Sequence, residues 1–237
     1  MTIAGAQPRC VSGEVRANAI THAEAVSTAE ARLVVFPELS LTGYELDATP
    51  VALDDPALRP LIAACTAADA IALVGAPIDE GGRRSIATLQ VDANGARVAY
   101  RKSHLGGDEP AHFAPGDGPT ALNIDGWRVG VGICKDTGVD AHIDGVARLG
   151  IDVYVAGLVH RPEELDEQDA RGQRIARTSD ATVVFASFAG ATGGGFDRTA
   201  GTSTAWAPDG TQLARASAEP GDLVLISLAS NGTGSEP

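Results

Sequence analysis

Short runs of Val, Ile and Leu alternate with alanine-rich stretches along this chain, and this alternation constrains its fold more than any other feature. Branched apolar runs between turn signals predict strands, whereas apolar residues that recur every three to four positions predict helices. The two signals follow one another here, which is typical of an α/β protein. We expect helices near 13–30 and 56–68, and strands at 32–36 and 70–76.

Hairpins interrupt this alternation. Segments 86–92 and 96–102 flank Asn94-Gly95, a pair that tolerates the positive φ of a tight turn, and Pro208-Asp209-Gly210 predicts another hairpin. The other expected elements are strands at 127–134, 151–157, 182–190 and 223–228, and helices near 139–149, capped by Leu149-Gly150, and 163–179. Hairpins mixed with helix-separated strands favour two mixed sheets packed face to face, with helices outside, over a doubly wound single sheet.

The composition excludes several classes of protein. The formal net charge of −13 would repel phosphate backbones and anionic lipids, so we expect no nucleic-acid partner, although an acidic surface also simply keeps a protein soluble. No apolar run reaches the ~20 residues of a membrane span. The first ten residues lack the pattern of a secretory signal, so we expect a cytoplasmic protein. Nothing resembles a linker, which predicts a single domain over residues 1–237.

Three cysteines, at positions 10, 65 and 134, cannot all pair within one chain and match no CxxC motif. We therefore interpret them as reduced thiols, with Cys10 and Cys65 as small packing residues. Cys134 differs because it ends the strand-like segment VGVGIC just before a stretch compatible with a helix. Such a position gives a thiol exposure and a dipole that favours thiolate, although a buried cysteine at the end of an apolar strand is the alternative.

Two other ionisable residues end apolar runs in the same way. Glu38 follows RLVVFP, a position that invites desolvation and the raised pKa of a general base, or else holds an ordinary loop glutamate. Lys102 ends the second strand of the first hairpin, where a surface lysine is the usual expectation. Neither residue is diagnostic by itself.

Together, and in this order, the three segments resemble the signatures of the nitrilase (carbon-nitrogen hydrolase) superfamily. VFPELSLTGY, with Glu38, matches its first signature almost letter for letter, and YRKSHL, with Lys102, is close to Tyr-Arg-Lys-x-His-Leu. The resemblance extends from about residue 3 to about residue 228. It implies a four-layer α-β-β-α sandwich of two mixed sheets, with a catalytic pocket at one end of the sheets.

The resemblance also implies a cysteine amidase with a Glu38-Lys102-Cys134 triad. Glu38 would take the thiol proton while the sulfur adds to the carbonyl of a small amide or carbamoyl compound. Lys102 and the backbone N–H of Lys135 would hold the oxyanion, and water would hydrolyse the thioester after ammonia or an amine leaves. No cofactor or metal is expected.

Further positions are assigned through the same resemblance. Glu109, four residues before Phe113 in a string that ends Pro-Gly, would position substrate and lysine, unless it is an exposed loop carboxylate. Tyr44, which ends the first signature, is a third substrate-positioning candidate beside Glu109 and Lys135. His104 and His112 lack a third ligand at a suitable spacing, so we interpret them as local hydrogen-bonding residues instead of metal ligands.

The chain departs from the family just after the cysteine. Lys135 replaces an aromatic residue, Val139-Asp140-Ala141 replaces Phe-Pro-Glu, and Asp144 falls near an expected arginine. We expect these changes to border the pocket. The absence of Cys-Trp-Glu argues for amides over nitriles, and Lys135 either recognises a substrate carboxylate or faces solvent. The glycine-rich segment 190–201 lacks a P-loop ending and is expected at the pocket mouth.

Other readings stay open. A non-catalytic relative would keep the fold but lose a triad member, and a nitrilase would act on nitriles. Amide transfer to another acceptor usually accompanies a membrane anchor or a fused domain, so free hydrolysis is preferred. The family commonly pairs through helices near the nucleophile and a C-terminal tail, which predicts a homodimer.

Overall fold

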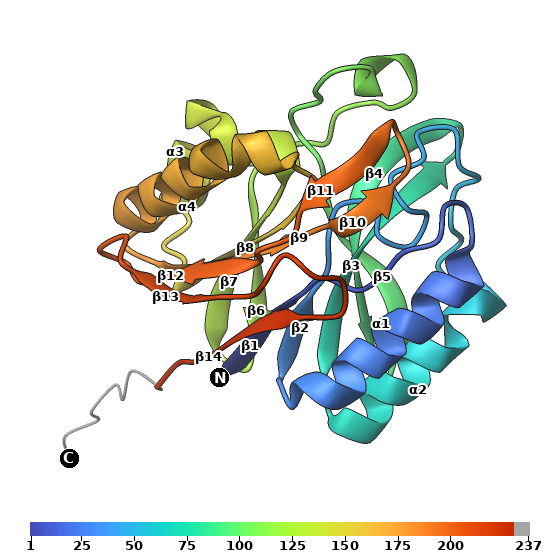
Figure 1. The fold of residues 1–237 in the computed structure, drawn as a ribbon, viewed down its shortest axis with the longest axis horizontal. Coiled ribbons are helices and arrows are strands. Elements are labelled where there is room, and N and C mark those ends of the chain that lie inside the picture. The colour runs from blue at the N-terminus through green and yellow to red at the C-terminus, as the bar shows by residue number, and fades with distance from the viewer. Residues whose placement is uncertain (230–237) are drawn as a thin grey trace.

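The computed structural model describes residues 1–229 and contains two six-stranded sheets that face each other, with a pair of helices outside each (Figure 1). In spatial order, the first sheet holds β14 (Leu223–Ser227), β1 (Thr2–Ala6), β2 (Leu33–Val35), β3 (Ile71–Glu80), β4 (Arg83–Asp92) and β5 (Gly95–Arg101). The second holds β13 (Gln212–Arg215), β12 (Thr204–Trp206), β9 (Thr182–Ser187), β8 (Val153–Leu158), β7 (Trp127–Ile133) and β6 (Thr120–Ile124). The helices are α1 (Val15–Ala29), α2 (Arg59–Ala68), α3 (Asp140–Ala147) and α4 (Leu165–Ser179).

Both sheets are mixed and are built in the same way. Each has three parallel strands at its centre, β1, β2 and β3 in the first and β7, β8 and β9 in the second. Antiparallel strands flank each trio, and they include the expected hairpins β4–β5 and β12–β13. The expectation of two mixed sheets is confirmed.

Alternation along the strands divides the apolar residues among three cores. In β2, Leu33 and Val35 face the second sheet, whereas Val34 faces α1 and α2. In β8, Val153 and Val155 face the first sheet, whereas Tyr154 and Ala156 face α3 and α4. Because successive side chains point to opposite faces of a strand, central strands that are buried on both faces read as continuous apolar runs. The four-layer α-β-β-α sandwich follows from this burial.

Two expected elements differ in detail. The glycine-rich segment is a two-stranded hairpin of β10 (Ala189–Thr192) and β11 (Phe196–Ala200), because glycines supply its turn. Helix α3 ends at Ala147, two residues before the expected cap, although Gly150 does adopt a positive φ of 61°. Among residues 1–229, none of the helices combines the length and apolar character needed to cross a membrane.

Candidate active site

Glu38 lies in a loop that is wedged between the two sheets. The loop leaves β2 through Phe36 and Pro37 and passes over Gly75 of β3 and Gly157 of β8. A Cβ atom on Gly75 would stand 2.5 Å from the Pro37 carbonyl oxygen, and one on Gly157 would stand 2.5 Å from that of Phe36. Glycine at both positions therefore lets the loop carry Glu38 into the interior, where its side chain is fully buried. It is not an ordinary loop glutamate.

Lys102 extends from the end of β5 toward this carboxylate. Its Nζ atom lies 2.6 Å from Oε1 of Glu38, and 2.6 and 2.8 Å from the two carboxylate oxygens of Glu109. Only 1% of the lysine side chain is exposed, so the expectation of a surface lysine is wrong. A lysine can be buried at this position because both neighbouring carboxylates accept hydrogen bonds from its ammonium group.

Cys134 begins a short 3₁₀ helix, η3 (Cys134–Gly138), directly after β7. Its φ of +37° is rare for a residue with a side chain, so the chain turns sharply at this point. The residue is half-buried, and its thiol donates to the carbonyl oxygen of Val159 at 3.6 Å. Strand, tight turn and helix follow one another as the sequence indicated.

The pKa values of the acid and the thiol are both raised. Burial raises the pKa of Glu38 to about 8, and the charge of Lys102 opposes this rise while that of Glu109 adds to it. Burial and the charge of Glu38 raise the pKa of the Cys134 thiol to about 12. The expected thiolate-favouring environment is therefore wrong for the resting site, because desolvation outweighs the attraction of Lys102. The thiol needs a base to lose its proton.

Glu109 and Tyr44 complete the surroundings of Lys102. Glu109 begins the 3₁₀ helix η2 (Glu109–Ala111) and is 2% exposed, which rules out an exposed loop carboxylate. Its Oε1 accepts from the Tyr44 hydroxyl at 3.0 Å, and its Oε2 accepts from the backbone N–H of Gly106 at 2.8 Å. Burial alone would lower the pKa of the Lys102 ammonium, but Glu38, Cys134 and Glu109 together raise it. The lysine is therefore charged.

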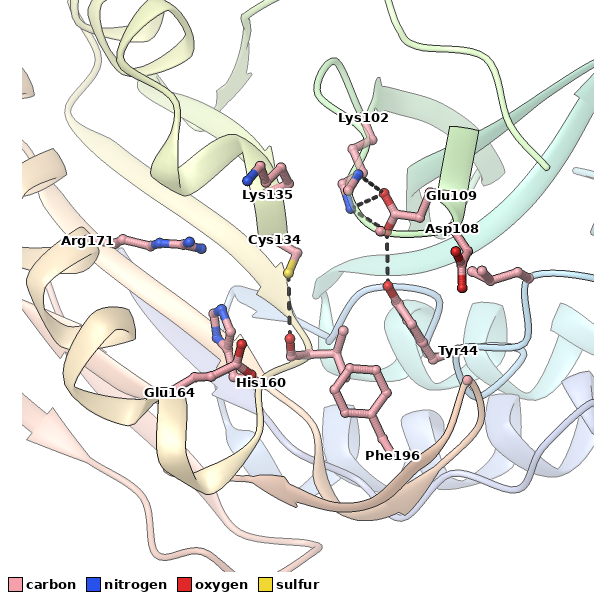
Figure 2. Close-up of a pocket in the computed structure, with 15 residues that line it drawn as sticks. Tyr44, Lys102, Asp108, Glu109, Cys134, Lys135, His160, Glu164, Arg171 and Phe196 are labelled. Atoms are coloured by element: carbon pink, nitrogen blue, oxygen red, sulfur yellow. Dashed lines mark hydrogen bonds and ion pairs between the residues drawn. The ribbon is translucent and has the colours of Figure 1, made fainter. Parts of the chain in front are cut away.

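These groups meet at one end of a cavity of about 580 Å³ (Figure 2). Cys134, Lys102, Glu109, Tyr44 and Lys135 all line it, whereas Glu38 lies behind Lys102. The lining residues that the sequence did not single out are Leu46, Gly106, Gly107, Asp108, Val159, His160, Glu164 and Arg171, and Gly194 and Phe196 complete the lining. Gly194 and Phe196 belong to the hairpin of β10 and β11, so the expectation that the glycine-rich segment reaches the pocket holds. The size suits a small molecule.

Comparison with known proteins agrees with this geometry. The profile of the family described as carbon-nitrogen hydrolase matches residues 2–235. The chain belongs to the carbon-nitrogen hydrolase family. A hydrolase in the pqqF 5' region of Pseudomonas protegens is 29% identical over 206 residues, which cover 82% of this chain and 71% of that protein. An (R)-stereoselective amidase from Pseudomonas sp. is 30% identical over 152 residues, or 59% of this chain and 56% of that enzyme.

Solved structures share the fold of this carbon-nitrogen hydrolase. The NitN amidase from Nesterenkonia sp. AN1 superposes with a TM-score of 0.86 at 24% identity, covering 97% of this chain and 93% of that chain. A variant of the Nesterenkonia amidase in complex with butyramide gives a TM-score of 0.85 at 23% identity, with 96% and 90% of the two chains covered. The expected nitrilase-like fold is thus confirmed.

The departures from the family pattern lie in different places. Lys135 is exposed to solvent and also lines the cavity of this hydrolase. Its position therefore fits both of the expected alternatives. Val139-Asp140-Ala141 and Asp144 are absent from the lining within residues 1–229, which corrects the expectation that they border the pocket. They form the start of α3, whose apolar face packs on the second sheet. Arg171 of α4 reaches the cavity instead, beside Gly138.

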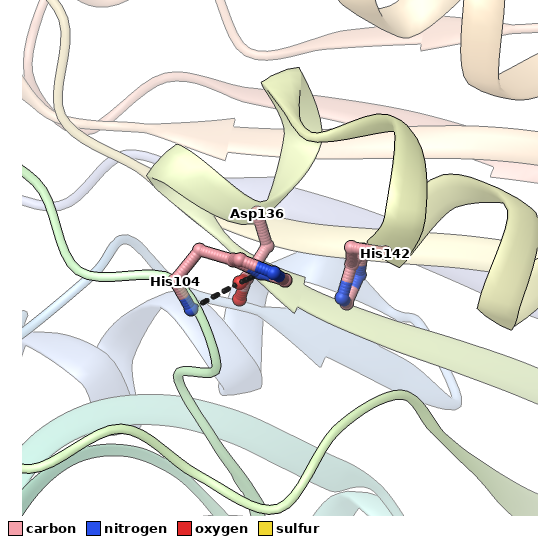
Figure 3. A group of neighbouring side chains, drawn as sticks. All are labelled: His104, Asp136 and His142. Atoms are coloured by element: carbon pink, nitrogen blue, oxygen red, sulfur yellow. Dashed lines mark hydrogen bonds and ion pairs between the residues drawn. The ribbon is translucent and has the colours of Figure 1, made fainter.

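Three side chains near Cys134 form a cluster of metal-ligating types (Figure 3). Ligand atoms of His104, Asp136 and His142 lie within 4.8 Å of one another. Both oxygens of Asp136 are already bonded, one to the ring and backbone N–H of His104, the other to Tyr100 and the backbone N–H of Ile133. His142 contacts the Tyr154 hydroxyl at 3.1 Å. We therefore interpret the cluster as a clamp that joins the segment after Lys102 to the cysteine turn.

Proposed function

We propose that this carbon-nitrogen hydrolase is a cysteine amidase that cleaves a small amide or carbamoyl compound through a thioester on Cys134. The observation that carries the proposal is the environment of the Glu38 carboxylate. Oε1 is held by Lys102 at 2.6 Å, whereas Oε2 is buried without a hydrogen-bond partner among residues 1–229. Cys134 lies close enough to Glu38 to lower the pKa of that carboxyl. Glu38 thus has one oxygen fixed and one available to accept a proton.

In the first step, Glu38 takes the proton of the Cys134 thiol while the sulfur bonds to the substrate carbonyl carbon. The carbonyl π electrons move to oxygen, and the ammonium of Lys102 with the backbone N–H of Lys135 stabilises that negative charge. When the tetrahedral intermediate collapses, the carbon-nitrogen bond breaks and Glu38 returns its proton to the leaving nitrogen. Ammonia or an amine departs, and an acyl group remains on sulfur.

In the second step, Glu38 takes a proton from water as the water oxygen attacks the thioester carbon. Collapse of the second intermediate breaks the carbon-sulfur bond, and the sulfur recovers its proton from Glu38. A base with a pKa of about 8 can both accept and return a proton near neutral pH. Glu109, which accepts a hydrogen bond from Tyr44, holds Lys102 in place during both steps.

The experiment that tests this proposal measures ammonia release from small amides, ureido compounds and nitriles. Butyramide belongs in the panel because a variant of the structurally similar Nesterenkonia amidase binds it. Intact-mass spectrometry of the wild type would detect an acyl adduct, and Cys134→Ala is the control that cannot form one. Ammonia release with an adduct only when Cys134 is present supports the proposal. A protein that is inert toward the whole panel, with Cys134 unreactive to iodoacetamide, would instead be a non-catalytic relative.

The expectations of a single domain over 1–237, a homodimer and a cytoplasmic location stay predictions. Residues 230–237, which make up most of the tail invoked for the dimer, lie outside the described part of the chain.

A further inference from the structure

The cavity holds two cations that the proposed chemistry does not use. Lys102 is bonded to Glu38 and Glu109 and is assigned to the oxyanion, so it is not available to a distant part of the substrate. Lys135 has no ion-pair or side-chain hydrogen-bond partner within residues 1–229, and Arg171 donates from Nη2 alone, to Glu167. The Nε and Nη1 groups of Arg171 are therefore available to a ligand.

The position of these cations relative to Cys134 favours a specific role. In Figure 2 the charged ends of Lys135 and Arg171 lie on one side of the Cys134 sulfur, and Lys102 with Glu109 lies on the other. Only 17% of the Arg171 side chain is exposed, so its guanidinium is partly desolvated. A substrate whose carbonyl carbon meets Cys134 would extend its far end toward this pair.

The acidic residues near this pair leave the Lys135 ammonium and the Nε and Nη1 groups of Arg171 without a protein acceptor among residues 1–229. Glu164 accepts from the backbone N–H of Arg161 at 2.7 Å, as part of the turn that begins α4. Asp108 lies beyond Glu109, on the opposite side of Cys134 (Figure 2). Burial lowers the pKa of His160, so this ring adds no positive charge near neutral pH. Glu167 pairs with Arg171 through Nη2 and Glu164 lines the same cavity, so anion binding here depends on the free donors of Lys135 and Arg171 and not on an excess of positive charge.

We propose that Lys135 and Arg171 select substrates with a carboxylate a few bonds from the scissile amide carbon. This inference rests on the proposed amidase function and names its substrate class. A guanidinium and an ammonium together can bind a carboxylate by charge-assisted hydrogen bonds, and the planar fork of arginine sets its orientation. The net charge of −13 repels anions at long range, so the attraction has to come from these neighbouring cations.

Two matched pairs of substrates test the inference and distinguish where the carboxylate sits. Succinamate and butyramide share a chain length but differ in a carboxylate or methyl end on the acyl side. N-Carbamoylglycine and ethylurea differ in the same way on the nitrogen side. We expect wild-type kcat/KM to favour the acidic member of at least one pair by about 10-fold or more. Equal values within both pairs would overturn the inference while leaving the amidase function standing.

Variants separate recognition from folding. Arg171→Gln and Lys135→Met should each lower kcat/KM for the preferred acidic substrate about 10-fold more than for its neutral partner, mainly through KM. Arg174→Gln is the matched control, because Arg174 is on the same helix but pairs with Asp140 outside the cavity lining. An equal loss for both members of the pair would show a merely structural role.

Binding to the Cys134→Ala protein gives a readout that does not depend on turnover. Calorimetry should show the preferred acidic compound binding about 10-fold more tightly than its neutral partner, and Arg171→Gln in that background should remove the difference. Equal affinities would contradict carboxylate recognition. If the difference is present but the wild type releases no ammonia from any compound, the anion site stands and the amidase function fails.

Discussion

The two walls of the cavity differ in how their polar groups are bonded. On one wall, Lys102 bonds to two carboxylates, and Glu109 bonds in turn to Tyr44 and to a backbone N–H. On the other wall, Lys135 has no partner within residues 1–229 and Arg171 uses one of its nitrogens. A buried charge such as that of Lys102 needs a partner in the protein, whereas the exposed ammonium of Lys135 is solvated and needs none. We call the first the bonded wall, because its groups bond to one another without a substrate, whereas the second keeps donors free for the carboxylate proposed above.

Cys134→Ala should give the largest change, since it removes the proposed nucleophile, which lies between the two walls. We expect kcat to fall by at least about 10⁴-fold. The midpoint of thermal unfolding should change little, because the half-buried thiol gives up one weak hydrogen bond, with Val159, and the packing of one sulfur atom. Wild-type-like turnover would sink the mechanism, and a large loss of stability would make the rate uninterpretable.

Glu38→Gln should give the second-largest loss of activity. The amide cannot accept the thiol proton, so kcat should fall about 10²- to 10⁴-fold. The wild-type kcat/KM should rise with pH through about 8, because Glu38 must lose its proton to act as a base. The variant should lack that rise, which a pH profile would show. A residual activity with an unchanged profile would assign the titration to another group.

Lys102→Met and Lys135→Met test the difference between the two walls through the free energy of unfolding. Removing the lysine leaves two buried carboxylates without their partner, so we expect a loss of about 3–5 kcal/mol in the free energy of unfolding. Lys135→Met, on the opposite wall, should change it by less than about 0.5 kcal/mol because that side chain is exposed. Urea titrations of both variants would measure this contrast. Equal losses would mean that the walls do not differ as described.

Glu109→Gln should have a smaller effect on turnover. The amide fills the same space but holds Lys102 less firmly, so the rate should fall about 10-fold. Labelling of Cys134 by iodoacetamide should proceed at the wild-type rate if Glu109 acts by positioning. Slower labelling would place Glu109 in activation of the thiol.

Tyr44→Phe should show the smallest change of this series. It removes one hydrogen bond, of 3.0 Å, to a carboxylate that keeps its bonds to Lys102 and Gly106. We expect a loss of about 1–2 kcal/mol in stability and of less than about 10-fold in rate. A collapse of activity would instead indicate direct contact between the Tyr44 hydroxyl and substrate.

The residues of the bonded wall could be predicted because each lies in a short sequence motif. Glu38, Lys102 and Cys134 each end an apolar strand, and the strings around them resemble known signatures. The opposite wall could not be foreseen in the same way. Arg171 lies in a helix whose polar sequence indicates only a solvated face, and His160 follows a strand without any motif. No short sequence motif shows that either side chain lines the same cavity as Cys134.

The sequence alone predicted the helices, most of the strands and the two mixed sheets, and it singled out Glu38, Lys102 and Cys134 as candidates, but it missed β1, β6 and the β10–β11 hairpin. Periodicity and turn residues act over a few positions, so they can be read along the chain. The tertiary structure decided how buried these groups are and in which direction their pKa values shift. Glycines at 75 and 157 let the Glu38 loop enter between the sheets, and the resulting burial raises the pKa values of Glu38 and Cys134. Desolvation depends on every neighbour in space, which no short stretch of sequence contains.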